Sequence, residues 1–151
     1  MCKFAKTVLL CYPSLDENIV KTQAELKNFA VKSHCLDGKC REDTTFNLMV
    51  KAASLAEEKR LLLQLKSAAG QALFELEPKY RALLNLRYIK RDNLEVIMAK
   101  TRLCQTTLYR YYKAALKAFA AKMKFMGCGK EWFEENCLSV KWINSLYKNV
   151  K

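Results

Sequence analysis

Apolar residues recur at three- and four-residue intervals along most of this chain. Between residues 44 and 74 the spacing is carried by Leu48, Ala52, Leu55, Leu62, Leu65, Ala69 and Leu73. Such a stripe is one face of a long amphipathic helix. Only two Pro and four Gly interrupt the 151 residues, and no sustained strand-type alternation is present. The pattern therefore predicts an all-α fold, a helical bundle.

Turn-forming residues divide this pattern into successive helices. Residues 1–13 are expected to form a short mixed segment that ends at Pro13, and Ser14 or Asp16 is expected to cap a helix reaching about residue 33. Pro78 suits the first turn of a later helix, because its missing N–H costs little there. Gly70 is expected to weaken the last turn of the long helix, and Gly127-Cys128-Gly129 to end another.

We group the expected helices into three regions. An N-terminal helical region covers residues 1–75 with two main helices, and a central module covers 76–126 with helices near 78–90, 94–100 and 105–126. An aromatic helical tail, 127–151, is expected to pack on the bundle. Its Trp132, Phe133 and Trp142 fit either a docking site or the bundle's own core, and we favour the core.

Positive charge is concentrated in the central module. The chain has a net charge of +12, and residues 79–124 hold twelve Lys and Arg against the two acids Asp92 and Glu95. The remaining residues hold 15 bases and 13 acids. A surplus confined to one segment is typical of a module that binds a polyanion.

A short helix, a turn near 101–104 and a longer helix from Gln105 describe a helix–turn–helix. Its second helix enters the major groove, so the first turns of that helix should carry the side chains that read bases. We predict base contacts from Gln105, Thr106, Tyr109 and Arg110. The inward face is expected to hold Leu108, Tyr112, Ala115 and Leu116, with Tyr112 chosen as the core tyrosine among 109, 111 and 112.

Residues 76–117 resemble the C-terminal promoter-binding domain (region four) of bacterial sigma factors. The matching positions are Leu76, Pro78, Arg81, Leu84, Leu86-Arg87-Tyr88, Glu95, Ile97, Thr107-Leu108 and Ala115-Leu116. The resemblance implies that Gln105, Thr106, Tyr109 and Arg110, called the reader residues below, face bases. Phosphate contacts are expected from Arg87, Lys90, Arg91, Lys100, Thr101, Arg102 and Lys113. The whole chain is also similar to small sigma-like proteins of low-GC Gram-positive bacteria and their mobile elements.

Three residues depart from the family's pattern at the turn. Met98 stands where the family has Ala, which allows the two helices to approach closely. Arg102 replaces the turn glycine, where a positive φ would strain any other residue. Cys104 replaces the usual N-cap Ser, and a thiol is a poor capping acceptor.

The seven cysteines do not indicate a disulfide scaffold. Their number is odd, their spacing is scattered and no signal peptide or membrane span is visible, so we expect a cytoplasmic protein with free thiols. His34, Cys35 and Cys40, with Cys2 or Cys11, suggest a zinc site. The gap between Cys35 and Cys40 exceeds that of a zinc knuckle and no second pair follows, so no metal or other cofactor is predicted.

Catalytic motifs are missing from the sequence. One His, no phosphate-binding Gly loop and only adjacent carboxylate pairs favour a protein that is not an enzyme. We therefore expect a DNA-binding transcriptional regulator, of phage or mobile-element type, with double-stranded DNA as partner and RNA polymerase as a second candidate. The alternative is a protein-interaction module that kept the fold but lost specific DNA readout. Nonspecific RNA binding is a further alternative, and the oligomeric state stays open.

Overall fold

The computed structural model describes residues 2–35 and 42–151. Within them the regular structure is entirely helical, which confirms the all-α prediction. Two long helices, α1 (Lys3–Cys35) and α2 (Glu42–Glu75), come first. They are followed by α3 (Pro78–Leu84), the π-helical turn η1 (Asn85–Ile89), α4 (Leu94–Thr101), α5 (Gln105–Phe125), α6 (Lys130–Asn136), the 3₁₀ turn η2 (Cys137–Ser139) and α7 (Lys141–Asn149).

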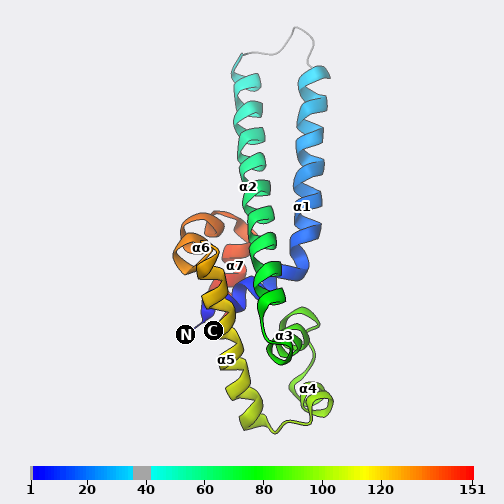
Figure 1. Cartoon of the computed structure of the whole chain (residues 1–151). Coiled ribbons are helices and arrows are strands. Elements are labelled where there is room, and N and C mark those ends of the chain that lie inside the picture. The colour runs from blue at the N-terminus through cyan, green and yellow to red at the C-terminus, as the bar shows by residue number, and fades with distance from the viewer. Residues whose placement is uncertain (1, 36–41) are drawn as a thin grey trace.

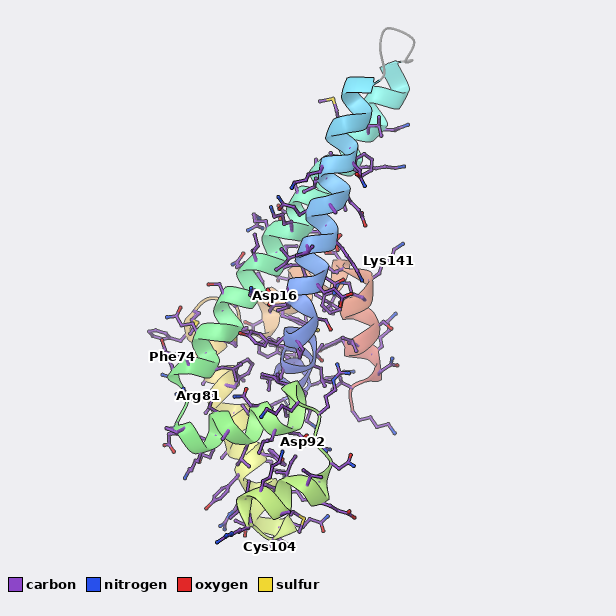
Figure 2. The ribbon with its side chains drawn as sticks, turned by 90° about the vertical axis from the view of Figure 1, so that its right-hand side faces the viewer. Asp16, Phe74, Arg81, Asp92, Cys104 and Lys141 are labelled. Carbon is purple, nitrogen blue, oxygen red and sulfur yellow. The ribbon has the colours of Figure 1, made fainter. Side chains whose placement is uncertain are left out.

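The molecule consists of a long hairpin standing on a globular base. Helices α1 and α2 run side by side away from the base, and the shorter helices gather around their other ends (Figure 1). The side view shows the same separation, with Asp16 on the hairpin and Cys104 at the opposite end of the molecule (Figure 2). Both chain ends lie in the base, where Lys6 Nζ donates a hydrogen bond to the backbone oxygen of Lys151 at 3.2 Å.

The N-terminal segment differs from the sequence prediction. Helix α1 begins at Lys3 and continues through Pro13, so the expected separate segment and the expected N-cap at Ser14 or Asp16 are both wrong. Proline lacks an N–H and crowds the preceding turn, which bends a helix rather than always ending it. The first part of α1 is bent away from the hairpin accordingly (Figure 1). Helix persists because both sides of the bend bury apolar residues, Val8 and Leu9 before it and Leu15 after it.

Gly70 lies within α2 without ending it, since the helix continues to Glu75. A Cβ atom at residue 70 would lie 3.2 Å from the hydroxyl oxygen of Tyr12. The missing side chain therefore lets α1 approach α2 closely at this point. That contact offsets the lower helix propensity of glycine.

One hydrophobic core joins the three regions of the sequence. Phe4 of α1 packs edge-to-face on Phe133 of α6 with ring centroids 5.4 Å apart, and Phe119 of α5 is fully buried in the same cluster. Phe133 is itself fully buried, while Trp132 and Trp142 are half-buried against the cluster. The tail aromatics thus belong to the protein's own core, as predicted.

The end of α5 is set by Gly127, as predicted. Gly127 has a φ of 77°, and the N–H of Cys128 donates to the carbonyl of Met123 at 3.0 Å. The N–H of Gly127 donates to the carbonyl of Lys124 at 3.0 Å. These two bonds form a Schellman motif, in which glycine adopts the left-handed conformation at little cost. Met123 and Cys128 are both buried, so the same turn directs the chain back onto the core.

Candidate nucleic-acid interface

Helices α4 and α5 are joined by the three residues 102–104, which agrees with the predicted short helix, turn and longer helix. A small core holds them together with α3: Leu83, Ile97, Leu108 and Tyr112 are buried against one another. All four positions expected to face inward on α5 are buried, namely Leu108, Tyr112, Ala115 and Leu116. Figure 1 shows α3 and α4 beside the first half of α5.

The tyrosines of α5 have three different environments. Tyr112 is 6 % exposed, which confirms it as the core tyrosine, whereas Tyr109 is 48 % exposed. Tyr111 is half-buried and packs edge-to-face on Tyr80 of α3, with ring centroids 6.5 Å apart. Tyr109 is therefore the most exposed of the three, and it lies near the start of α5.

The four predicted base-contact residues share one exposed surface. Gln105, Thr106, Tyr109 and Arg110 are all exposed on the first two turns of α5. Met98, the departure from the family's alanine, is half-buried against the small core and so lies away from this surface. The opposite side of the same turns is buried. The first two turns of α5 therefore have one polar, exposed face and one face that packs against the rest of the protein.

The turn before α5 has the backbone conformation expected to strain a non-glycine residue. Arg102 has φ 56° and ψ 30°, in the left-handed region. Cys104, at the N-cap, makes no side-chain capping bond, and its Sγ lies 3.1 Å from the hydroxyl oxygen of Thr107. That hydroxyl, and after it the backbone amides at the start of α5, lower the pKa of the exposed Cys104 thiol.

The predicted phosphate-contact residues fall into two groups. Side chains that are exposed and have no carboxylate partner among the described residues are Arg87, Lys90, Arg91, Arg102 and Lys113. The other two have internal partners: Lys100 Nζ lies 2.9 Å from Asp92 Oδ2, and the Thr101 hydroxyl donates to the carbonyl of Ile97 at 2.7 Å. A phosphate contact from either would require giving up that bond.

Most of the positive charge in residues 79–124 is solvent-facing and unpaired. Arg81 is structural, since it donates to the carbonyl oxygens of Phe74 and Leu76 at 2.9 and 3.2 Å. Figure 2 shows Arg81 beside Phe74 at the end of α2. Lys79 and Lys122 pair with Glu77 and Glu75 at 3.8 and 3.4 Å. With Lys100 also paired, nine of the twelve bases have no carboxylate partner within the part of the chain that the structure describes, and eight of these remain when the structural Arg81 is left out.

Two basic residues that sequence reasoning missed lie beside this surface. Lys6 of α1 and Lys117 of α5 line a cavity of about 380 Å³ together with Arg87, Tyr109 and Lys113. Lys117 follows Lys113 by four residues, and that helical spacing is a signal that identifies their common face. Lys6 is far away in sequence, and no local pattern connects it with the module.

The remaining candidate chemistry is limited. Among the described residues, no group of three or more His, Cys, Asp or Glu side chains is placed to hold a metal ion. The side chains of His34, Cys35 and Cys40, considered above as zinc ligands, are not among those that the structure describes. Cys11 is buried in the core, and burial raises its pKa to about 12. None of the described helices combines the length and apolarity needed to span a bilayer.

Comparison with known proteins adds no family assignment. No family model, no curated protein and no solved structure matches this chain. The likeness to region four of sigma factors consequently depends on the matching residues of the sequence alone. The arguments below therefore start from the geometry and charge of α3 to α5.

Proposed function

We propose that this protein is a transcriptional regulator that binds double-stranded DNA through α4, the turn and α5. One observation carries the proposal: Gln105, Thr106, Tyr109 and Arg110 are all exposed on the first two turns of α5, while the back of those turns is buried. A recognition helix needs this combination, because its N-terminal side chains must reach base edges while the helix stays fixed on its support.

Local electrostatics favour the same surface. Eight unpaired Lys and Arg side chains lie on or near α3 to α5, and phosphate contacts supply most of the nonspecific affinity of DNA-binding proteins. Arg87, Lys90 and Arg91 come from η1 and the turn after it, and Arg102 from the turn before α5. We expect these side chains to contact the DNA backbone while the predicted base-contact residues enter the groove.

The reader residues have distinct expected roles. Arg110 has the planar fork that binds the O6 and N7 atoms of guanine, and Gln105 has the amide that binds the N6 and N7 atoms of adenine. Thr106 can contact either a base or the thymine methyl group. Lys100 and Thr101 remain part of the proposed phosphate set, with a smaller expected contribution because of their internal bonds.

Selection from a pool of random duplexes at 50 and 200 mM salt tests the proposal. We expect a defined sequence motif, and an affinity that falls roughly 10³-fold between the two salt concentrations for six or more phosphate contacts. Strong salt dependence without a motif would replace regulation by nonspecific nucleic-acid binding. No duplex binding at either concentration would refute the proposal.

A second candidate function is docking to a protein partner, such as RNA polymerase. Phe46, Met49 and Val50 are 67, 65 and 51 % exposed near the beginning of α2, and their i, i+3, i+4 spacing puts them on one face. Apolar side chains grouped in this way are typical of interaction sites. Replacement of all three by Ser, followed by a pull-down with purified RNA polymerase, tests this candidate separately from DNA binding.

A further inference from the structure

The cavity beside the reader surface has an unusual combination of wall residues. It has a volume of about 380 Å³ and is bounded by the first turns of α1, by η1 and by α5. Its lining contains three aromatic hydroxyls and four cationic groups: Tyr88, Tyr109, Tyr112, Lys6, Arg87, Lys113 and Lys117. None of its described lining residues carries a carboxylate. The cavity therefore suits a ligand that combines a negative charge with a flat ring.

Size and chemistry together narrow the ligand class. A volume of 380 Å³ is at the lower end of the range of roughly 300–1,000 Å³ for small-molecule sites. Tyrosine rings stack on nucleobases, a contact worth about 1–3 kcal/mol per base. Lysine and arginine groups bind phosphate through charge-assisted hydrogen bonds. A single nucleotide satisfies all three requirements, whereas a dinucleotide cofactor is too large.

Tyr112 provides an independent sign that a polar ligand is accommodated here. Its side chain lines the cavity and is 94 % buried, and its hydroxyl has no hydrogen-bond partner among the described residues. An unpartnered buried polar group costs about 1–3 kcal/mol, which a ligand atom at the site would offset. Burial raises the pKa of Tyr112 and of Tyr88, so both phenols are neutral and do not repel an anion.

The π-helical turn supplies one wall of the cavity. The N–H of Lys90 bonds to the carbonyl of Asn85 at 2.8 Å, five residues back, where an α-helix would use the carbonyl four residues back. The extra residue per turn re-aims the side chains that follow, and Arg87 and Tyr88 from this turn line the cavity. Single π-turns of this kind occur frequently at functional sites.

We propose that this cavity binds a nucleoside monophosphate, with the base against the tyrosines and the phosphate near Lys113 and Lys117. Arg87, Tyr109 and Lys113 belong both to the cavity wall and to the predicted DNA-contacting set. A bound nucleotide therefore competes with DNA for these three side chains. The competition rests on the proposed function, whereas nucleotide binding itself does not.

Isothermal titration of the full chain with AMP, GMP, CMP and UMP tests the binding step. At least one of them is expected to bind in a 1:1 ratio with a Kd of about 1 mM or tighter. Adenosine and inorganic phosphate are each expected to bind at least about tenfold more weakly, since each lacks half of the contacts. No saturable binding of any nucleotide, or phosphate binding as tightly as the nucleotides, overturns the proposal.

Two variants locate the site, and a third is the matched control. Lys117→Ala and Tyr112→Phe are each expected to weaken nucleotide binding about fivefold or more, the size of one lost hydrogen bond to a charged or polar group. Lys124→Ala removes another exposed charge of α5 that does not line the cavity, and should leave binding unchanged. Equal losses in Lys117→Ala and Lys124→Ala would mean general charge attraction and would overturn the site.

Separate readouts distinguish this proposal from the DNA proposal. Lys117 and Tyr112 are not predicted DNA contacts, and Arg110 does not line the cavity. Tyr112→Phe should therefore keep duplex binding, because it removes only the hydroxyl of a buried side chain, and Arg110→Ala should keep nucleotide binding. Nucleotide binding without duplex binding supports the nucleotide proposal and refutes the DNA proposal. Duplex binding without nucleotide binding supports the DNA proposal and refutes the nucleotide proposal. A 5′-phosphorylated tetranucleotide that binds more tightly than AMP would identify a strand end, in place of a free nucleotide, as the ligand.

Discussion

Arg91 and Arg102 have the same left-handed backbone conformation, each with a φ of 56°. Arg102 directly follows α4, Arg91 lies three residues before its first residue, and both are predicted phosphate contacts. For an L-residue this conformation costs roughly 1–2 kcal/mol, and glycine adopts it at almost no cost. Strained backbone is often retained where the side chain has a function. Arginine at both positions therefore suggests that the charge is worth more than the lost stability.

Replacing Arg102 by glycine separates these two contributions. We expect Arg102→Gly to raise the free energy of unfolding by about 1 kcal/mol, because the strain at φ 56° is relieved. Duplex affinity should fall at the same time, since one phosphate contact is lost. Urea unfolding and duplex titration measure the two effects. Arg102→Lys is the control, with charge and strain both kept. A less stable glycine variant would contradict the strain argument.

Substitutions at the predicted base contacts and at the predicted phosphate contacts are expected to change DNA binding in different ways. Arg110→Ala and Gln105→Ala should relax the preference for the selected site by about 1–3 kcal/mol each, because each removes a bidentate pairing with one base. Lys90→Ala should weaken all duplexes equally and reduce the slope of log affinity against log salt by about 1. Titrations with the selected site and a scrambled duplex measure both. Identical behaviour of the two classes would rule out the groove model.

The ion pair between Lys100 and Asp92 predicts a gain of DNA affinity. Lys100 Nζ lies 2.9 Å from Asp92 Oδ2, so the lysine charge is partly neutralised within the protein. Asp92→Asn removes a negative charge from the interface and frees Lys100. We expect duplex affinity to rise by up to about tenfold at low salt, with a slope steeper by roughly 1, since one more counterion is released. The double variant Asp92→Asn/Lys100→Ala should lose this gain.

Cys104 is expected to react with alkylating reagents far faster than the buried thiols. Its pKa is lowered by the Thr107 hydroxyl, whereas burial raises the pKa values of Cys11 and Cys137 to about 12. The thiolate is the reactive form, so the alkylation rate of Cys104 should reach half its maximum below pH 9.0 and fall as the pH is lowered further. Mass spectrometry of iodoacetamide-treated protein measures each site.

Thr107→Val is the matched control for the thiol prediction. It keeps the shape of the side chain and removes the hydroxyl that lies 3.1 Å from Cys104 Sγ. The midpoint of the pH–rate curve should then move upward toward pH 9.0. An unchanged midpoint would show that the backbone amides at the start of α5, and not the hydroxyl, set the reactivity.

Local chemistry explains why much of the fold could be predicted. Pro78 begins α3 and Gly127 ends α5, because proline suits a first helical turn and glycine suits a positive φ. Helical spacing likewise identified Leu108 and Tyr112 as inward-facing on α5. The exposure of the four predicted base-contact residues follows from the same reasoning, since residues opposite a buried stripe are exposed.

Features that depend on distant contacts could not be predicted. Proline is a common helix stop, and only the burial of Val8 and Leu15 against later parts of the chain carries α1 through Pro13. Lys6 reaches the cavity because the bent start of α1 packs on α5, an arrangement without any local sequence signal. Residues 85–89 likewise contain no recognisable signal for the π-helical turn that they form.

The pairing of Phe4 with Phe133 has a consequence for the order of folding. During synthesis from the ribosome, the start of α1 emerges first, but its aromatic partner emerges about 129 residues later. The hairpin of α1 and α2 brings together neighbouring parts of the chain and can form early, whereas contacts of long sequence separation form slowly. Closure of the base must therefore follow formation of the hairpin. Until then the apolar start of α1 is exposed to chaperones and to other unfolded chains.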